Sequence, residues 1–137
     1  MRRLPILAIL IMAMVLGSIP VFAATTADIV KQKSMEAAKD YMTSGNMLAG
    51  EGKYAAAVKS YKQAIGMDPN LAEAYTLMGS ALAEDGKYKE AEEAMRKAIS
   101  LKPRFAEGYY HLGIFLKSQN RQSEADEAFR KAQQYAR

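Results

Sequence analysis

Apolar residues follow two different patterns along the chain. Residues 4–16 are apolar without interruption, whereas later residues alternate between apolar and polar positions with a helical period. One stretch has apolar or small residues at i, i+3, i+4 and i+7, which gathers them on one face of an α-helix; they are Tyr75, Met78, Gly79 and Leu82. A second run with this period extends from Ala91 to Ile99. The pattern therefore predicts pairs of amphipathic helices and an all-α fold.

The residues around the two runs predict where the helices end. Asp85-Gly86-Lys87 indicates a turn between them, in which Gly86 can take a left-handed backbone conformation. Pro103 is expected to end the second helix, because its ring cannot continue the hydrogen-bond ladder. After Pro69, Asn70 can cap the helix that follows. Gly79 is small, and we expect it to lie where the two helices of a pair approach closely.

The helix pair is written three times at a period of 34 residues, with no insertion between the copies. The positions that recur at this interval include Tyr41, Tyr75 and Tyr109; Gly45, Gly79 and Gly113; Leu48, Leu82 and Leu116; and Ala57, Ala91 and Ala125. In such repeats each copy is one supersecondary unit that buries its apolar face against its neighbours.

This pattern resembles that of the tetratricopeptide repeat family over residues 38–137. The family pattern W-x2-L-G-x2-Y, A-x3-F, P corresponds here to Tyr75-x2-Met78-Gly79-x2-Leu82, Ala91-x3-Met95 and Pro103. Ser44 departs from the pattern, since it is polar where the family prefers Leu. The resemblance implies an α-solenoid of helix-turn-helix repeats with right-handed superhelical stacking. Its three repeats would be 38–71, 72–105 and a truncated 106–137, with 24–37 as a linker or an N-terminal extension of the first helix.

Residues 1–23 have the organisation of a secretory signal peptide. Arg2 and Arg3 form a basic start, the apolar run follows, and Gly17-Ser18 and Pro20 are expected to break any helix there. Small residues then provide a site for a signal peptidase. We expect export to the periplasm or the medium.

The cleavage site and the fate of the signal are left open at this point. The favoured cut is after Ala23, and the second choice is after Ala24. The alternative is an uncleaved signal that anchors the protein in the inner membrane, because residues 4–24 reach the ~20 mostly apolar residues that a spanning helix needs.

Composition excludes several kinds of chemistry. The chain has no cysteine and one histidine, His111, so thiolate metal sites are excluded and a histidine-based metal centre or catalytic triad is disfavoured. We therefore expect neither an enzyme nor a cofactor. Residues 1–23 carry two arginines and no acid, so their removal leaves 17 basic and 15 acidic residues and a net charge of +2. This balance gives no basic face for nucleic acid.

Charged residues at helical spacing predict exposed ion pairs rather than an acid–base centre. Spacings of three to four residues separate the acids Glu92-Glu93 from the bases Arg96-Lys97, and the acids Asp126-Glu127 from the bases Arg130-Lys131. Pairs at this spacing lie on the same helix surface and contribute a few tenths of a kcal/mol each.

The resemblance places the binding function on the first helices of the repeats, which line a concave groove in the family. The groove positions predicted from it are Lys39, Met42, Asn46 and Ala49 in the first repeat, Glu73, Thr76, Ser80 and Ala83 in the second, and Glu107, Tyr110, Ile114 and Lys117 in the third. Adaptable Met and Tyr side chains suit a peptide or an amphipathic helix of another exported or envelope protein.

Some co-chaperones of the family clamp an acidic C-terminal peptide between Lys, Asn and Arg side chains. At the matching positions this chain keeps Asn46 but has Met42, Leu77, Glu107 and His111, so we expect no such clamp. Two alternatives stay open. The groove positions can be ordinary surface, or the protein can be a scaffold that forms homo-oligomers through a partly uncapped C-terminal end, because the family's additional capping helix is absent.

Overall fold

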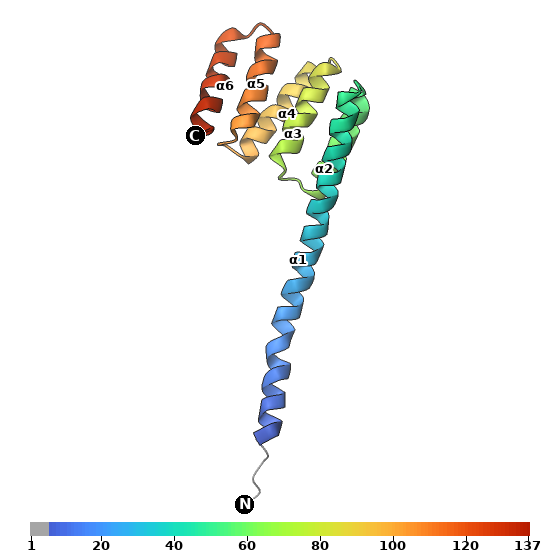
Figure 1. Ribbon diagram of the computed structural model, residues 1–137. Helices are drawn as coiled ribbons and strands as arrows, with labels where there is room; N and C mark the ends of the chain where they lie inside the picture. Colours follow the sequence, from blue (N-terminus) through green and yellow to red (C-terminus); the bar gives the residue numbers. More distant parts are fainter. Residues whose placement is uncertain (1–5) are drawn as a thin grey trace, which may run out of the picture. The chain divides into compact units, whose positions relative to one another are not determined.

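The computed structural model describes residues 6–137, and their side chains from residue 25 onward. Residues 35–137 form one compact unit, and the residues before them form a separate one. Within the described residues there are six helices and no strand, so the predicted all-α class is confirmed (Figure 1). The helices are α1 (Ile6–Gly50), α2 (Tyr54–Met67), α3 (Ala72–Glu84), α4 (Tyr88–Leu101), α5 (Ala106–Ser118) and α6 (Gln122–Tyr135).

The helices of residues 35–137 form antiparallel pairs that pack against one another in chain order. Figure 1 shows α3 beside α4 and α5 beside α6, and the C-terminal part of α1 packs on α2 through Gly45 and Tyr61. A continuous core runs through the pairs, and its largest fully buried apolar side chains are Tyr61, Met95 and Leu116. Each helix thus buries its apolar face partly against the other helix of its pair and partly against the next pair.

Close approach within a pair requires glycine. A Cβ atom at Gly79 would lie 2.7 Å from Cγ of Met95 and 3.0 Å from the carbonyl oxygen of Ala91. At Gly113, the equivalent position one period later, it would lie 2.6 Å from the Phe129 ring. The expectation of a close helix–helix approach at Gly79 is confirmed.

The turn between the two helices of each pair contains one residue in the left-handed backbone conformation. Gly52 and Gly86 have φ angles of 75° and 78°, and Asn120 takes the third equivalent position with φ 59°. At the second turn, the N–H of Lys87 donates to the carbonyl of Leu82 at 2.9 Å, the hydrogen bond that closes a Schellman motif. The predicted left-handed conformation of Gly86 is confirmed.

The predicted capping role of Asn70 is wrong. The residue before α3 is Leu71, and no side chain caps this helix. The backbone N–H of Asn70 instead donates to Oδ1 of Asp68 at 3.0 Å. Asp68 forms this local turn directly after α2, which places Asn70 one residue too early to reach the first N–H groups of α3.

The expected break at Gly17-Ser18 and Pro20 is also wrong, because α1 continues through all three residues. A proline removes one backbone hydrogen bond, and a helix that continues on both sides needs no second nucleation. The beginning of the signal, residues 1–5, and the side chains of the cleavage region up to Ala24 lie outside the described residues. Within the part of the chain whose side chains are described, no helix is long and apolar enough to span a membrane.

Candidate functional site

The twelve predicted groove residues all lie on α1, α3 and α5, but they differ in accessibility. The exposed members are Lys39, Asn46, Glu107, Tyr110, Ile114 and Lys117. The half-buried members are Met42, Ala49, Glu73, Ser80 and Ala83. Thr76 is the remaining member. The exposed side chains therefore come from α1 and α5, while α3 between them presents small or partly covered ones.

Thr76 is not part of an accessible surface, which corrects its prediction as a groove residue. Only 1% of it is exposed, and its hydroxyl donates to the carbonyl of Ala72 at 3.2 Å. It lies within the packing of α3 against its neighbouring helices. A threonine can be buried in this way because its hydroxyl donates to a carbonyl of its own helix. Sequence spacing alone does not distinguish such a buried threonine from an exposed one.

Asn46 is held in place by a buried side chain of the facing helix. The Tyr61 hydroxyl on α2 donates to Oδ1 of Asn46 on α1 at 2.7 Å. Tyr61 is 2% exposed, and burial raises the pKa of its hydroxyl, so the group stays a donor at neutral pH. Since this bond uses the amide oxygen of Asn46, the amide NH₂ is the group suited to donate to a bound acceptor.

A polar cluster joins α3 to α5. Oγ of Ser80 and Nδ1 of His111 share a hydrogen bond of 3.0 Å, although the two residues are 31 positions apart. Nε2 of His111 lies 3.9 Å from Oε1 of Glu107, one turn earlier on α5. The sequence alone placed Ser80 and Glu107 among the groove positions but did not predict that His111 links them.

This order of hydroxyl, imidazole and carboxylate does not form a hydrolytic triad. Ser80 also donates to the carbonyl of Thr76 at 3.3 Å, which ties its hydroxyl to its own helix. Ser80 lies in the interior of α3, where backbone N–H groups are used by the helix and cannot form an oxyanion hole. The 3.9 Å separation of His111 and Glu107 is too long for the hydrogen bond that would orient the imidazole.

The exposed part of α5 carries the largest apolar side chains of the candidate site. Tyr110 is 53% exposed and Ile114 is 47% exposed. The Tyr110 ring lies 5.9 Å from that of Phe129 on α6. Beside it, a pocket of about 410 Å³ opens between α5 and α6, lined mainly by Ala106, Tyr110, Phe129, Ala132 and Gln133. Tyr110 and Ile114 make this face of α5 apolar, whereas the equivalent positions of α3 hold Thr76 and Ser80.

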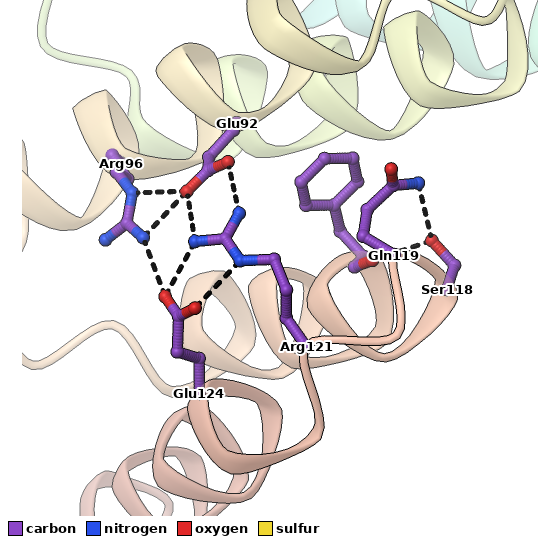
Figure 2. A network of polar contacts seen from close by, with 7 residues as sticks. Glu92, Arg96, Ser118, Gln119, Arg121 and Glu124 are labelled. Carbon is purple, nitrogen blue, oxygen red and sulfur yellow. Dashed lines mark hydrogen bonds and ion pairs between the residues drawn. The ribbon is translucent and has the colours of Figure 1, made fainter.

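An ion-pair network connects α4 to the beginning of α6 (Figure 2). Arg96 pairs with Glu92 at 2.7 Å, as predicted. Outside this network, Lys131 pairs with Glu127 at 3.0 Å, also as predicted, whereas Glu93 and Asp126 form no ion pair within the described residues. The sequence did not predict Arg121, which pairs with Glu92 and with Glu124 at 2.6 Å each. The hydrogen bond from Arg121 is the main reason that the pKa of Glu92 lies below its usual value.

Models of known families match most of the helical repeats. A TPR repeat model matches residues 45–86, and two copies of a tetratricopeptide repeat model match residues 72–105 and 106–137. The chain belongs to the tetratricopeptide repeat family. Proteins of this family are typically non-catalytic interaction modules. The comparison with curated proteins gives no match.

Solved structures of tetratricopeptide repeats are similar to the chain. MamA is 27% identical with a TM-score of 0.65; the match covers 75% of this chain, which spans 60% of the length of MamA. The second TPR of Spaghetti (RPAP3), bound to the HSP90 peptide SRMEEVD, is 25% identical with a TM-score of 0.68, covering 77% of this chain and 96% of that one. The Arabidopsis OM64 TPR domain is 27% identical with a TM-score of 0.66, covering 72% and 82%.

Proposed function

We propose that this tetratricopeptide repeat protein is a non-catalytic adaptor of the cell envelope. In this proposal it binds a peptide or an amphipathic helix of another exported protein along α1 and α3. The observation that carries the proposal is Asn46, whose amide oxygen is held by the buried Tyr61 hydroxyl at 2.7 Å. An amide fixed in this way can donate to a main-chain carbonyl of a peptide without losing rotamer freedom on binding. The second TPR of Spaghetti (RPAP3), which is bound to an HSP90 peptide, supports peptide binding by a repeat array of this kind.

The ligand is expected to differ from an acidic C-terminal peptide. The positions that would need Lys, Asn or Arg hold Met42, Leu77, Glu107 and His111, so the side chains that clamp a terminal carboxylate are missing. Half-buried Met42 beside exposed Asn46 on α1 instead offers an apolar contact next to an amide. We therefore propose a neutral or basic segment with an apolar anchor residue as the ligand.

The envelope location rests on the organisation of residues 1–23. A basic start, an apolar run and small residues at the end support export, with cleavage after Ala23. N-terminal sequencing of the protein recovered from the periplasm or the medium tests this. A start at Ala24 or Thr25 supports the proposal, whereas a protein found only in the cytosol with Met1 retained contradicts it.

Affinity capture from an envelope extract tests the binding site. The wild-type protein is compared with Asn46→Ala, which removes the amide, and with Tyr61→Phe, which keeps the ring and removes the hydroxyl. Both variants should lose the same partner. Lys89→Ala, an exposed substitution on α4, serves as the control and should retain it. An identical set of captured proteins for all four would exclude Asn46 as a binding residue.

A second candidate function is self-assembly as a scaffold. It is favoured by the exposure of Tyr110 and Ile114 on α5, where two large apolar side chains contact water over about half of their surface. Apolar side chains that gather on an exposed face are typical of interaction surfaces.

A further inference from the structure

Four exposed residues of α5 form one stripe, which we call the α5 stripe: Glu107, Tyr110, Ile114 and Lys117. They stand at i, i+3, i+7 and i+10, so they lie on one face of the helix. The stripe is about 15 Å long at 1.5 Å per residue. It begins with an acid, ends with a base, and has the two large apolar side chains between them.

The α5 stripe is complementary to a reversed copy of itself. Leu112 is midway between Tyr110 and Ile114 in the sequence, and it is also midway between Glu107 and Lys117. Leu112 itself is buried on the opposite side of α5, so it marks only a level along the helix. A two-fold axis that crosses the α5 stripe at this level would set two α5 helices antiparallel. Glu107 would then face Lys117 of the partner subunit, and Tyr110 would face Ile114 of the partner subunit. Each contact would occur twice, as an isologous interface requires.

We propose that the α5 stripe is a homodimer interface in which two copies of this chain pair through antiparallel α5 helices. The proposal extends the second candidate function and is independent of the peptide site at Asn46. The partner is a second copy because the stripe supplies both halves of each contact. An unrelated partner would not require the acid and the base to be placed symmetrically about the apolar pair.

The equivalent positions on the other first helices lack this symmetry. On α3 they are Glu73, Thr76, Ser80 and Ala83, with no base at the end, and Thr76 is buried. On α1 they are Lys39, Met42, Asn46 and Ala49, with no acid. Self-complementarity is therefore a property of α5 alone among the three helices and not a consequence of the repeat itself.

A head-to-tail stack, with α1 of one copy seated on α5 and α6 of the next, is disfavoured by α1. In the chain, α5 packs onto the preceding pair, and its residues Gly108 and Leu112 are buried. The residues of α1 at these positions are Asp40 and Ser44, both exposed. Seating α1 in the same way would bury the Asp40 carboxylate, which is costly without a partner. A closed two-fold pair avoids this cost.

The dimer should be weak and sensitive to salt. A stripe of four side chains is smaller than the roughly 800 Å² per partner of a stable interface. Tyr110 packs on Phe129, and the apolar pocket beside it adds contact area. Glu107 is 59% exposed and lies beyond hydrogen-bond range of His111, so its carboxylate can reach a partner. Exposed ion pairs mainly fix orientation and are screened by salt.

Charge exchange tests the interface directly. Sedimentation equilibrium of the purified protein, from about 10 µM to 1 mM in low salt, should show a monomer–dimer equilibrium for the wild type. Glu107→Lys or Lys117→Glu should each weaken it about tenfold or more, because a single substitution makes both symmetry-related pairs repulsive. The double variant Glu107→Lys/Lys117→Glu should restore it. A one-to-one mixture of the two single variants should form a heterodimer.

Each outcome decides the proposal. A wild type that stays monomeric at 1 mM overturns it, and so do single variants that weaken the dimer when neither the double variant nor the mixture restores it. Glu90→Lys, an exposed charge reversal on α4, is the control and should dimerise like the wild type. Circular dichroism establishes that every variant is folded. Loss of partner capture by Asn46→Ala is measured separately, so failure of one proposal leaves the other intact.

Discussion

Arg121 binds the carboxylate of Glu92 in a bidentate manner, through both terminal nitrogens of its guanidinium group. Nη1 donates to Oε2 at 2.6 Å and Nη2 donates to Oε1 at 3.2 Å, although the residues are 29 positions apart. Nε of Arg121 also donates to Glu124 at 2.8 Å. The network therefore ties α4 to Arg121, the residue directly before α6 (Figure 2), and a bidentate contact of this kind fixes geometry as well as charge.

The network predicts a dependence of stability on pH. The Arg121 hydrogen bond holds the pKa of Glu92 below its ordinary value. The unfolded chain, with a glutamate pKa of about 4.3, therefore takes up the proton first as the pH falls. The contribution of Glu92 is fully present above that pH and is lost as the pH falls through the lower pKa of the folded state.

Glu92→Gln should flatten this part of the stability profile. Urea denaturation at pH 7, 5, 4 and 3 would measure the free energy of unfolding of both proteins. The wild type should lose more stability than Glu92→Gln between pH 5 and pH 3. The exposed neighbour Glu93 offers the matched control, since Glu93→Gln leaves the network unchanged. Parallel profiles for wild type and Glu92→Gln would show that the network does not couple to folding.

Gly79→Ala should destabilise the protein by about 1–3 kcal/mol, the usual cost of overpacking. The added methyl group would lie 2.7 Å from Met95 and 3.0 Å from a backbone oxygen, and the latter cannot move without shifting α4. Gly66→Ala is the matched control, because nothing lies within 4 Å of its Cβ position and it is also in a helix. It should stabilise by roughly 0.5–1 kcal/mol. Thermal and urea unfolding would measure both, and changes of equal sign would contradict the explanation.

Asn120→Gly should stabilise the protein by several tenths of a kcal/mol, up to about 1 kcal/mol. Asn120 has a φ of 59°. This left-handed conformation is higher in free energy for a residue with a Cβ atom than for glycine. Gly86 has the same role one period earlier with φ 78°, so Gly86→Ala should destabilise by about 1 kcal/mol. Differential scanning calorimetry should place the midpoints of the two variants on opposite sides of the wild type.

Tyr61→Phe should cost about 0.5–1.5 kcal/mol, the net contribution of a typical hydrogen bond. The hydroxyl donates to Asn46 at 2.7 Å from a buried ring. A double-mutant cycle with Asn46→Ala isolates this contact, because the second substitution should cost little once the first has been made. Tyr88→Phe is the control, since Tyr88 is 51% exposed. Additive effects of Tyr61→Phe and Asn46→Ala would show that the two groups are not coupled.

Much of the fold follows from the sequence because its causes are local. A helical period of apolar residues selects the helix and the face that it buries. Gly79 and Gly86 mark a close approach and a left-handed turn, two requirements that a side chain would violate. The failures were local as well: Asn70 was expected to cap α3, but Leu71 occupies the N-cap position, and Pro20 did not end α1.

The site depended on contacts between helix pairs, which a period of 34 residues does not encode. Ser80 and His111 meet across 31 residues, and Glu92 and Arg121 across 29. Thr76 is buried while Tyr110, at the equivalent position one period later, is exposed. The sequence by itself determined the helices, their pairing and the residues that had to be small, since steric and periodic constraints act within a few residues. Only the tertiary structure decided which polar groups meet and which side chains reach water, because both depend on how one pair packs on the next.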